Sequence, residues 1–385
     1  LEMLSNAPIS EKAKRDYVRL YKGNEFYLPE MPKENYYSFL NEMSYQDYLK
    51  NYVRVDDEVI AIMMASARGV WAVNIDAFPA SAAWAYDYPG FQALGSYYEY
   101  EGESEPNIFH FPDGNASIAR LLVRNMIPSV ATGNSMEDIV TAKFNYNELD
   151  KENNQINIRL NSTVIKVVHR QNDLTKNVNI SYMRDGKINT IEAKKCIMAC
   201  YNNIIPYLCP EMPAQQKMAL KNCIRAPLVY TNVLIKKWQS FVNLGIRRAE
   251  MPGFLHHNVR LDFPVSMGKY QFSKNPSDPV VIHMQSVPGE YGNPSAREQF
   301  IAGQRKLLAT PFSEFERSIR NQLTRLLSKG GFDASEDILG ITVNRWPHGY
   351  AYGYDPETDQ VAFDMDSWPP EKPVSYTHLT LPTKA

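Results

Sequence analysis

Residues 156–200 read INIRLNSTVIKVVHRQNDLTKNVNISYMRDGKINTIEAKKCIMAC and carry most of the information about the fold. Apolar and polar side chains alternate along several short runs, which is the period of a β-strand. The residues Arg184-Asp-Gly-Lys187 predict a hairpin turn between two of these runs. We expect strands at 156–160, 164–169, 178–182, 188–191 and 195–200, the last apolar enough to be buried on both faces.

Helices are expected on both sides of this β-rich stretch. Apolar residues repeat with helical spacing over 118–127, and helical patterns recur in 1–68, 294–308 and 313–327. Further strands are expected at 228–235, 254–259, 280–284 and 338–344, whereas the aromatic residues 345–354 show neither pattern and predict a loop. Because helices flank the strands, the sequence favours an α/β protein with an open sheet and a small meander over an all-β sandwich.

The composition is that of an ordinary globular protein. The chain has 385 residues, 44% of them hydrophobic, and a formal net charge of −2. A general nucleic-acid-binding protein would carry a basic excess, so no nucleic-acid partner is expected. No apolar run is long enough for a membrane span. The four cysteines (Cys196, Cys200, Cys209 and Cys223) are expected to be free thiols, because they are few for a chain of this length.

Both ends of the chain are unusual. It begins at Leu1 within polar helical sequence, and residues 374–385 have no periodicity and resemble a translated sequencing adapter. We therefore expect an internal fragment of a longer protein, followed by a non-native tail. Its compartment, cytoplasmic or periplasmic, is left open.

A tight turn at 110–117 leads into the helix expected over 118–127. Gly114 permits a close approach of the backbone, and Asn115 is suited to cap the helix. The first N–H groups of a helix have no intrahelical partners, so this end suits a phosphate or an electronegative ligand edge. An ordinary capped helix is the alternative.

Three longer motifs resemble one protein family. They are Tyr88-Pro-Gly-Phe-Gln-Ala-Leu-Gly95, His110-Phe-Pro-Asp-Gly-Asn-Ala-Ser-Ile-Ala-Arg-Leu-Leu-Val-Arg124 and Val343-Asn-Arg-Trp-Pro-His-Gly-Tyr-Ala-Tyr352. With the segments 161–167 and 196–202, they resemble the flavin-containing amine oxidase superfamily over most of residues 40–365. Within it, the sequence is most similar to the bacterial spermidine dehydrogenase-like group.

The resemblance implies FAD as the cofactor and a Rossmann-like FAD/NAD(P)-binding domain interleaved with an α+β substrate domain. It places Val164 at the adenine side of FAD and the loop at 345–354 beside the flavin. The expected cofactor contacts are Gly114, Asn115, Ala116, Val164, Ala199 and Trp346. The family's G-x-G-x-x-G loop for the pyrophosphate does not occur in this sequence. The cofactor domain is therefore expected to be incomplete.

The resemblance also predicts where the domains divide. Residues 1–105 would form the helical, aromatic-rich part of the substrate domain, and 106–225 the central part of the FAD domain with its β-meander. Residues 226–342 would return to the substrate domain with an antiparallel sheet and helices. Residues 343–373 would return to the FAD domain, leaving 374–385 as the tail.

The implied reaction is oxidation of an amine or a spermidine-like polyamine by hydride transfer to the flavin, with the electron acceptor left open. His348, Tyr350 and Tyr352 in the aromatic loop are the candidate catalytic residues. Ordinary packing of an aromatic loop, with a structural role for His348, is the alternative.

A polyamine also needs partners for its distal ammonium groups. Asp76 and Asp87, beside Trp84, are the candidates, because carboxylates and aromatic faces both bind cations. A solvated loop with buried aromatic residues is the alternative. No metal site is expected, because the adjacent His256 and His257 would point to opposite faces of a strand.

Two other functions stay open. The first is a flavin-dependent desaturase or porphyrinogen-oxidase-like enzyme that acts on an apolar substrate. The second is a non-catalytic ligand-binding protein with the same fold.

Overall fold

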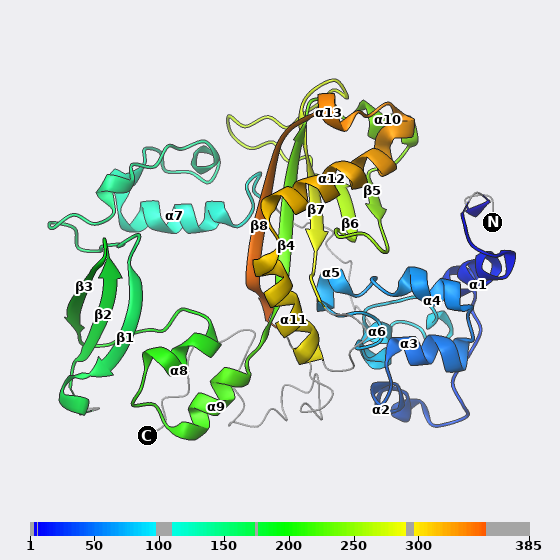
Figure 1. The fold of residues 1–385 in the computed structure, drawn as a ribbon, viewed down its shortest axis with the longest axis horizontal. Coiled ribbons are helices and arrows are strands. Elements are labelled where there is room, and N and C mark those ends of the chain that lie inside the picture. Colours follow the sequence, from blue (N-terminus) through cyan, green and yellow to red (C-terminus); the bar gives the residue numbers. More distant parts are fainter. Residues whose placement is uncertain (1–3, 6, 98–109, 174–175, 290–295, 352–385) are drawn as a thin grey trace. The chain divides into compact units, whose positions relative to one another are not determined.

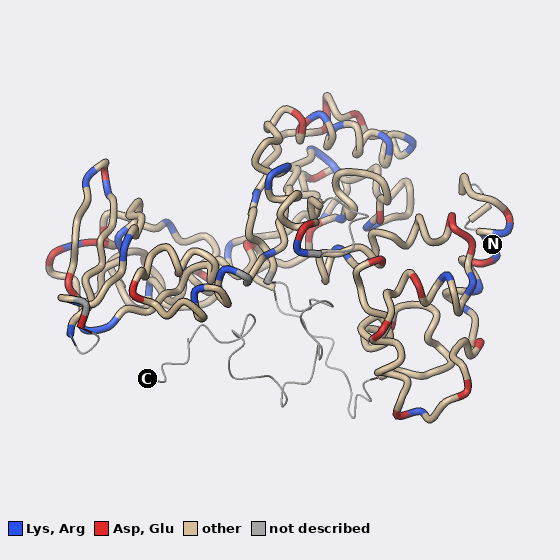
Figure 2. Tube along the Cα trace, turned by 60° about the horizontal axis from the view of Figure 1, so that its bottom comes forward, with Lys and Arg blue, Asp and Glu red and all other residues tan. Residues whose placement is uncertain are grey.

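The computed structural model describes residues 4–5, 7–97, 110–173, 176–289 and 296–351. The chain divides into two compact units (Figure 1). Of the described residues, those within 4–97, Arg225–Leu261 and 281–351 form the first unit, and those within 110–224 and Asp262–Val280 form the second. Acidic and basic residues are both scattered along the trace of each unit (Figure 2), in keeping with the small net charge.

The N-terminal part of the first unit is largely helical, as predicted. Its helices are α1 (Glu11–Lys22), α2 (Tyr36–Asn41), α3 (Tyr45–Tyr48), α4 (Asp57–Met63), α5 (Arg68–Trp71) and α6 (Ala80–Ala85). The side chains of Ser44 and Asp56 accept hydrogen bonds from the first turns of α3 and α4, so each helix begins at a capping residue. Tyr45 and Tyr48 are buried and stack on Phe91, which ties α3 to the segment after α6.

The rest of the first unit is a five-stranded sheet with helices against it. The strands are β4 (Arg225–Ile235), β5 (Arg248–Glu250), β6 (Asn258–Leu261), β7 (Val280–Ser286) and β8 (Ile338–Ala351), in the order β5-β6-β7-β4-β8. The helices are α10 (Gln239–Leu244), α11 (Ala296–Ala309), α12 (Phe312–Leu327) and α13 (Ala334–Asp337). Figure 1 shows α11 and α12 beside β4 and β8, and both helices contact β8.

The two faces of this sheet differ in burial. Along β7, Val280, Ile282 and Met284 are buried, whereas the alternate residues His283 and Gln285 are half-buried. Side chains on a strand alternate between faces, so one face is apolar and the other is polar.

The aromatic segment predicted as a loop is instead the second half of β8. It pairs with β4 in antiparallel register, with Leu228 opposite Trp346 and Ala226 opposite Tyr350. The strand is long because β4 supplies backbone hydrogen-bond partners, which a local sequence pattern does not reveal. Gly349 lies in the bulge between these pairs, where a Cβ atom would be 2.5 Å from the Cβ of Leu228.

The second unit contains a three-stranded antiparallel meander. Its elements are α7 (Ala116–Met126), β1 (Thr163–His169), β2 (Val178–Arg184), β3 (Lys187–Ala193), α8 (Ile205–Leu208) and α9 (Ala214–Asn222). Asp185 and Gly186, with φ of 51° and 73°, turn the chain between β2 and β3. The predicted helix, three of the predicted strands and the hairpin turn are confirmed.

Two predicted strands of this unit are wrong. Residues 156–160 form no strand: Ile158 donates its backbone hydrogen bond to the carbonyl of Leu149 and packs on the cluster around Ile127. Residues 195–200 form none either, and Ile197 is 83% exposed instead of buried. No strand of the described residues pairs with either segment, and a strand requires a partner to satisfy its backbone groups.

The mixed helix and sheet composition is confirmed. All strand registers defined in the described ranges are antiparallel, so the open α/β sheet is not found in them. The Rossmann-like domain stays a prediction. Among the described helices, none combines the length and the apolar character that crossing a bilayer requires.

The close approach of α11 to neighbouring residues at Gly303 predicts that a larger residue there destabilises the protein. A Cβ atom there would be 2.1 Å from the carbonyl oxygen of Pro288 and 3.0 Å from Cγ of Pro227. We expect Gly303→Ala to lower the free energy of unfolding by about 1–3 kcal/mol, because the backbone must shift. This loss exceeds the gain of about 1 kcal/mol that alanine brings to a helix.

Urea denaturation of the two proteins measures the effect. Gly340→Ala in β8 is the matched control, since a Cβ atom there has no neighbour within 4 Å. A Gly303→Ala protein as stable as the control would contradict the close approach of α11 to Pro288.

Candidate functional site

The polar face of the five-stranded sheet carries a group of aromatic and amide side chains. Tyr230 comes from β4, His283 and Gln285 from β7, and Trp346 and Tyr350 from β8. We call these five residues the tyrosine-pair site. The positions on each strand differ by an even number of residues, so their side chains share one face. Trp346 is partly exposed and the other four are half-buried.

Hydrogen bonds centre on the hydroxyl of Tyr350. It lies 2.8 Å from the hydroxyl of Tyr230, and Nε2 of Gln285 donates to it over 3.2 Å. The carbonyl oxygen of Gly69, in α5, is 3.5 Å from the Tyr350 hydroxyl and 3.4 Å from Nε2 of Gln285. A consistent pattern has Tyr230 donate to Tyr350 and Tyr350 donate to Gly69. The Tyr350 hydroxyl is then fully used within the protein.

The rings around Tyr230 form an aromatic wall. Tyr230 meets Trp346 edge-on at 5.5 Å between ring centroids and His283 at 5.0 Å. Nδ1 of His283 is 3.0 Å from Oδ1 of Asn232, which fixes the imidazole plane. The wall therefore offers ring faces and edges in a fixed geometry.

Burial and the neighbouring Tyr230 raise the pKa of Tyr350. The phenol therefore stays protonated and uncharged at neutral pH. The tyrosine and tryptophan rings suit the apolar part of a ligand and an amine group, because ring faces attract cations. The positive charge of Arg260 also acts on Tyr350 and weakens the attraction for a cation there.

His348 does not join the two tyrosines of the site. Its Nδ1 lies 3.4 Å from Nε2 of Gln304 in α11, and Gln304 also donates to the carbonyl of Arg225. Burial, followed by the charge of Arg225, lowers the pKa of His348, which favours the neutral imidazole. The structure thus brings Trp346 and Tyr350 together and directs His348 toward α11. Tyr352 lies outside the described residues.

The residues expected to bind a distal ammonium group lie in the helical part of the first unit. Trp84 is buried and its indole N–H donates to the carbonyl of Gly95 at 2.8 Å. Asp87 is exposed in a left-handed backbone conformation with φ of 53°. Burial raises the pKa of Asp76, whose Oδ1 is buried without a hydrogen-bond partner among the described residues. Asp76 therefore has a buried oxygen that a ligand could use as a hydrogen-bond acceptor.

The other expected cofactor contacts lie in the second unit. Gly114, with φ of 69°, has open space where a Cβ would lie, and the Asn115 side chain makes no capping hydrogen bond. Ala116 is the first residue of α7. However, the carboxylate of Asp113 accepts a hydrogen bond from Ser117 Oγ at 2.6 Å and lies 3.5 Å from Nη1 of Arg120. The carboxylate thus already occupies the end of α7 where a phosphate would bind.

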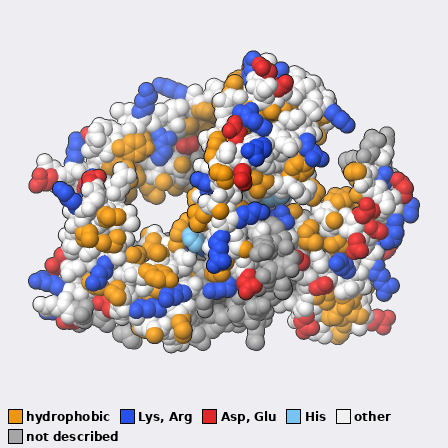
Figure 3. Space-filling model, in the orientation of Figure 1, with side chains coloured by type: hydrophobic (Ala, Val, Ile, Leu, Met, Phe, Trp, Pro, Cys, Tyr) orange, Lys and Arg blue, Asp and Glu red, His pale blue; other side chains and the backbone are white. Residues whose placement is uncertain are grey.

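Val164 and Ala199 are both exposed. Apolar side chains also lie on the surface of the second unit (Figure 3), among them Ile165 of β1 and Ile188 of β3. The described residues of this unit thus offer apolar surface next to Val164, and the sequence contains no G-x-G-x-x-G loop for the pyrophosphate of FAD.

The adjacent histidines are buried in the first unit. Nε2 of His256 lies 2.9 Å from Oγ1 of Thr231, and Gln322 donates to the carbonyl of His256. Among the described residues, neither ring nitrogen of His257 has a hydrogen-bond partner. Burial, followed by His257, lowers the pKa of His256 to about 3, and burial followed by Arg68 lowers the pKa of His257 to about 4. No group of three metal-ligating side chains is found among the described residues.

Tyr230, His283, Gln285 and Gly69 were not predicted from the sequence. Tyr230 and Gln285 lie in runs that the sequence predicts to be strands or to adjoin them. The sequence signal for these residues was a polar or aromatic side chain at every second position of a predicted strand. It occurs in Tyr230-Thr-Asn232 and in His283-Met-Gln285. Gly69 contributes only its carbonyl, for which there is no sequence signal.

No protein-family model matches the chain, and no curated protein matches it. Solved structures are similar at low identity. Putrescine oxidase bound to putrescine is 14% identical, with a TM-score of 0.43, over 90% of this chain and 66% of that chain. Cyclohexylamine oxidase from Brevibacterium oxydans is 10% identical (TM-score 0.39; 89% and 62%). Reduced UDP-galactopyranose mutase is 9% identical (TM-score 0.46; 89% and 61%). The chain spans slightly less than two thirds of the putrescine oxidase length.

The buried histidines predict a pH dependence of stability. In the unfolded chain a histidine binds its proton near pH 6.5, whereas His256 and His257 stay neutral in the folded protein down to about pH 3 and 4. The unfolded state therefore binds more protons below pH 6.5, and stability falls as the pH is lowered. We expect each histidine to lower the free energy of unfolding at pH 5 by about 2 kcal/mol relative to its value at pH 7.

Urea denaturation at pH 7 and pH 5 measures this loss. His257→Gln should remove about half of the two-histidine contribution, because the glutamine does not titrate. An unchanged difference between the two pH values in this variant would contradict a buried neutral His257.

Proposed function

We propose that this chain is part of an FAD-dependent oxidoreductase that oxidises the carbon–nitrogen bond of an amine or a spermidine-like polyamine. Two findings support the proposal. The motifs at 88–95, 110–124 and 343–352 resemble flavin-containing amine oxidases. The observation that carries the proposal is the tyrosine pair. The hydroxyl groups of Tyr230 and Tyr350 lie 2.8 Å apart on the polar face of the five-stranded sheet.

The chemistry of the pair suits an amine. An amine must lose its proton before it can give up a hydride, and an uncharged aromatic wall does not oppose that loss as a carboxylate would. The hydroxyl of Tyr350 is occupied by Gln285 and Gly69, so its ring, not its hydroxyl, would meet the substrate. Tyr230, Tyr350 and Trp346 would thus orient the reacting carbon by ring contacts.

FAD, when bound, accepts the hydride and carries the difficult step. The chain's own contribution would be orientation of the amine and exclusion of water. Trp346 and Tyr350 would contact the substrate or the flavin, and His348 and Tyr352 remain candidates for proton transfer. Val164 and Ala199 would contact the adenine, with Gly114, Asn115 and Ala116 nearby.

The distal ammonium group of a polyamine would bind among Asp76, Asp87 and Trp84. The unpartnered Oδ1 of Asp76 supports this assignment. An apolar substrate, as for a desaturase or a porphyrinogen oxidase, would leave that oxygen without a partner, which is unfavourable for a buried acceptor.

A non-catalytic ligand-binding protein is the second candidate function. Asp113 at the start of α7 and the absence of G-x-G-x-x-G from this sequence both favour it over a chain that binds FAD by itself. The same aromatic wall would then hold the ligand without chemistry.

Flavin reduction by an amine tests the proposal. The purified chain is mixed with FAD, and protein-bound flavin is followed by its visible absorption during anaerobic addition of spermidine. Tyr230→Phe and Tyr350→Phe should each slow bleaching roughly 3- to 10-fold, the loss of one hydrogen bond that holds the wall in place. Tyr207→Phe, an exposed tyrosine in the second unit, is the matched control.

Each outcome decides between the candidates. Protein-bound FAD that spermidine does not bleach would overturn the assignment to amine oxidation. A chain that takes up no FAD would favour the binding protein as the function of this chain by itself. Equal rates of bleaching in all three variants would show that the tyrosine pair is not part of the substrate site.

A further inference from the structure

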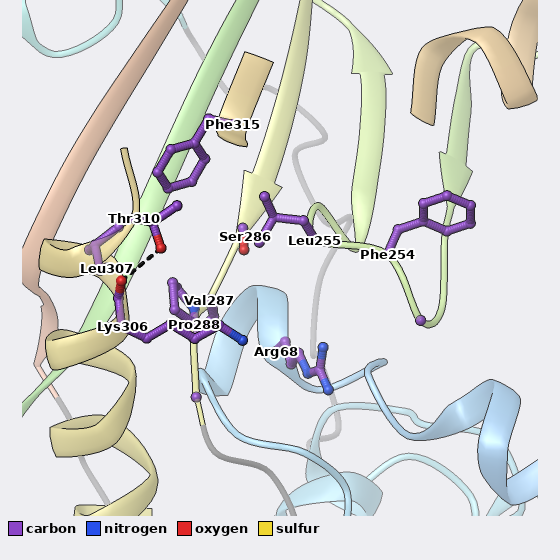
Figure 4. Close-up of a pocket in the computed structure, with 12 residues that line it drawn as sticks. Arg68, Phe254, Leu255, Ser286, Val287, Pro288, Lys306, Leu307, Thr310 and Phe315 are labelled. Carbon is purple, nitrogen blue, oxygen red and sulfur yellow. Dashed lines mark hydrogen bonds between the residues drawn. The ribbon is translucent and has the colours of Figure 1, made fainter. Parts of the chain in front are cut away.

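A separate pocket lies at one end of the five-stranded sheet. Its volume is about 420 Å³, within the range of small-molecule sites. It is lined by α5, the loop at 253–255, the end of β7 with the residues after it, the end of α11 and the start of α12 (Figure 4). Ser286 of β7 lines it, and Ser286 alternates with Gln285, so the pocket is not the tyrosine-pair site.

The lining of the pocket is positively charged. Arg68 and Lys306 are its two charged residues, and none of its twelve residues is acidic. Figure 4 shows them on either side of Val287 and Pro288, Arg68 in α5 and Lys306 near the end of α11. Asp76 feels the charge of Arg68 but does not line the pocket. The lining residues of the pocket thus carry two positive charges and no negative charge.

Arg68 is held in place before any ligand binds. Its Nε donates to Oδ1 of Asn74 over 2.6 Å, and Asn74 is buried. An anchored guanidinium loses little freedom on binding, and its planar fork matches a carboxylate or a phosphate. The charge of Arg68 also contributes to the lowered pKa of His257, so its field reaches the protein interior.

The remaining lining residues suit an organic molecule with an anionic group. Phe254, Leu255, Leu307 and Phe315 provide apolar surface, and Ser286 provides a hydroxyl group. The Thr310 hydroxyl donates to the carbonyl of Lys306 at 2.7 Å and is used within the protein. The pocket also adjoins the N-terminal end of α12, a helix of 16 residues whose cap, Pro311, makes no side-chain hydrogen bond. The positive end of that helix adds to the attraction for an anion.

We propose that this pocket binds a small organic anion, with its carboxylate or phosphate held by Arg68 and Lys306 and its apolar part against Phe254 and Leu255. This site goes beyond the proposed oxidation and does not depend on it. Arg68 is joined by a peptide bond to Gly69, whose carbonyl receives Tyr350 and Gln285.

Calorimetric titration of the whole chain tests the proposal with three probes. Benzoate carries a carboxylate on an apolar ring, phenyl phosphate carries a phosphate on the same ring, and benzamide is the neutral analogue. We expect benzoate or phenyl phosphate to bind and benzamide to bind at least tenfold more weakly, as loss of a charge-assisted contact implies. The stronger of the two anions identifies the group that the site prefers.

Two variants and a control locate the binding. Lys306→Gln changes an exposed side chain and should fold normally, while Arg68→Gln also removes the contact with Asn74. Each should weaken the bound anion roughly tenfold or more, the value of one charge-assisted hydrogen bond. Lys329→Gln, an exposed lysine after α12, should not.

Three results would overturn the proposal. The first is benzamide binding as tightly as the anions, and the second is anion binding that neither Lys306→Gln nor Arg68→Gln weakens. The third is inorganic phosphate binding as tightly as phenyl phosphate, which would exclude a role for the apolar lining. Unfolding of Arg68→Gln, seen by circular dichroism, would leave Lys306→Gln to decide.

Discussion

The antiparallel pairing of β4 with β8 is the constraint on which the rest of the first unit depends. It joins Tyr230 to Tyr350 across 120 residues of sequence, so the chain between them must close a long loop before the contact can form. The ladder from Arg225 to Ile235, although interrupted by two register shifts, supplies the hydrogen bonds that offset this cost. With the ladder in place, α11 has a surface to pack on, and Gly303 can approach Pro288 as closely as it does.

The alternation of side chains along each strand places the buried apolar residues of this unit on one face of the sheet and the residues of the candidate site on the other. Val229, Val233, Ile282 and Met284 are buried on one side, and the tyrosine pair lies on the other. A site built on paired strands is more rigid than one built on a loop, because each backbone is fixed by its neighbour. The aromatic wall is therefore positioned by the same hydrogen bonds that stabilise the fold.

Local patterns in the sequence predicted the elements whose stability is local or whose partners are near in sequence. The α7 helix, the β1–β3 meander and its Asp185-Gly186 turn belong to this group. The predicted secondary structure was wrong where pairing with a distant segment determines it, as for the second half of β8. It was also wrong where no described strand pairs with the segment, as for residues 195–200. The same reason explains the site. Trp346 and Tyr350 were found as an aromatic cluster, but Tyr230 and Gln285 join them only through pairing, and His348 was separated from them by the bulge.

That bulge has a consequence for how this segment can evolve. Between its two pairs β4 advances by two residues, from 226 to 228, while β8 advances by four, from 346 to 350. The surplus is even, so Trp346 and Tyr350 emerge on the same side of the sheet. Loss or gain of a single residue here would exchange the sides of histidine and tyrosine without altering any side chain. The number of residues in this stretch is thus as much a part of the site as their identity, and variation by substitution should be tolerated there more readily than variation in length.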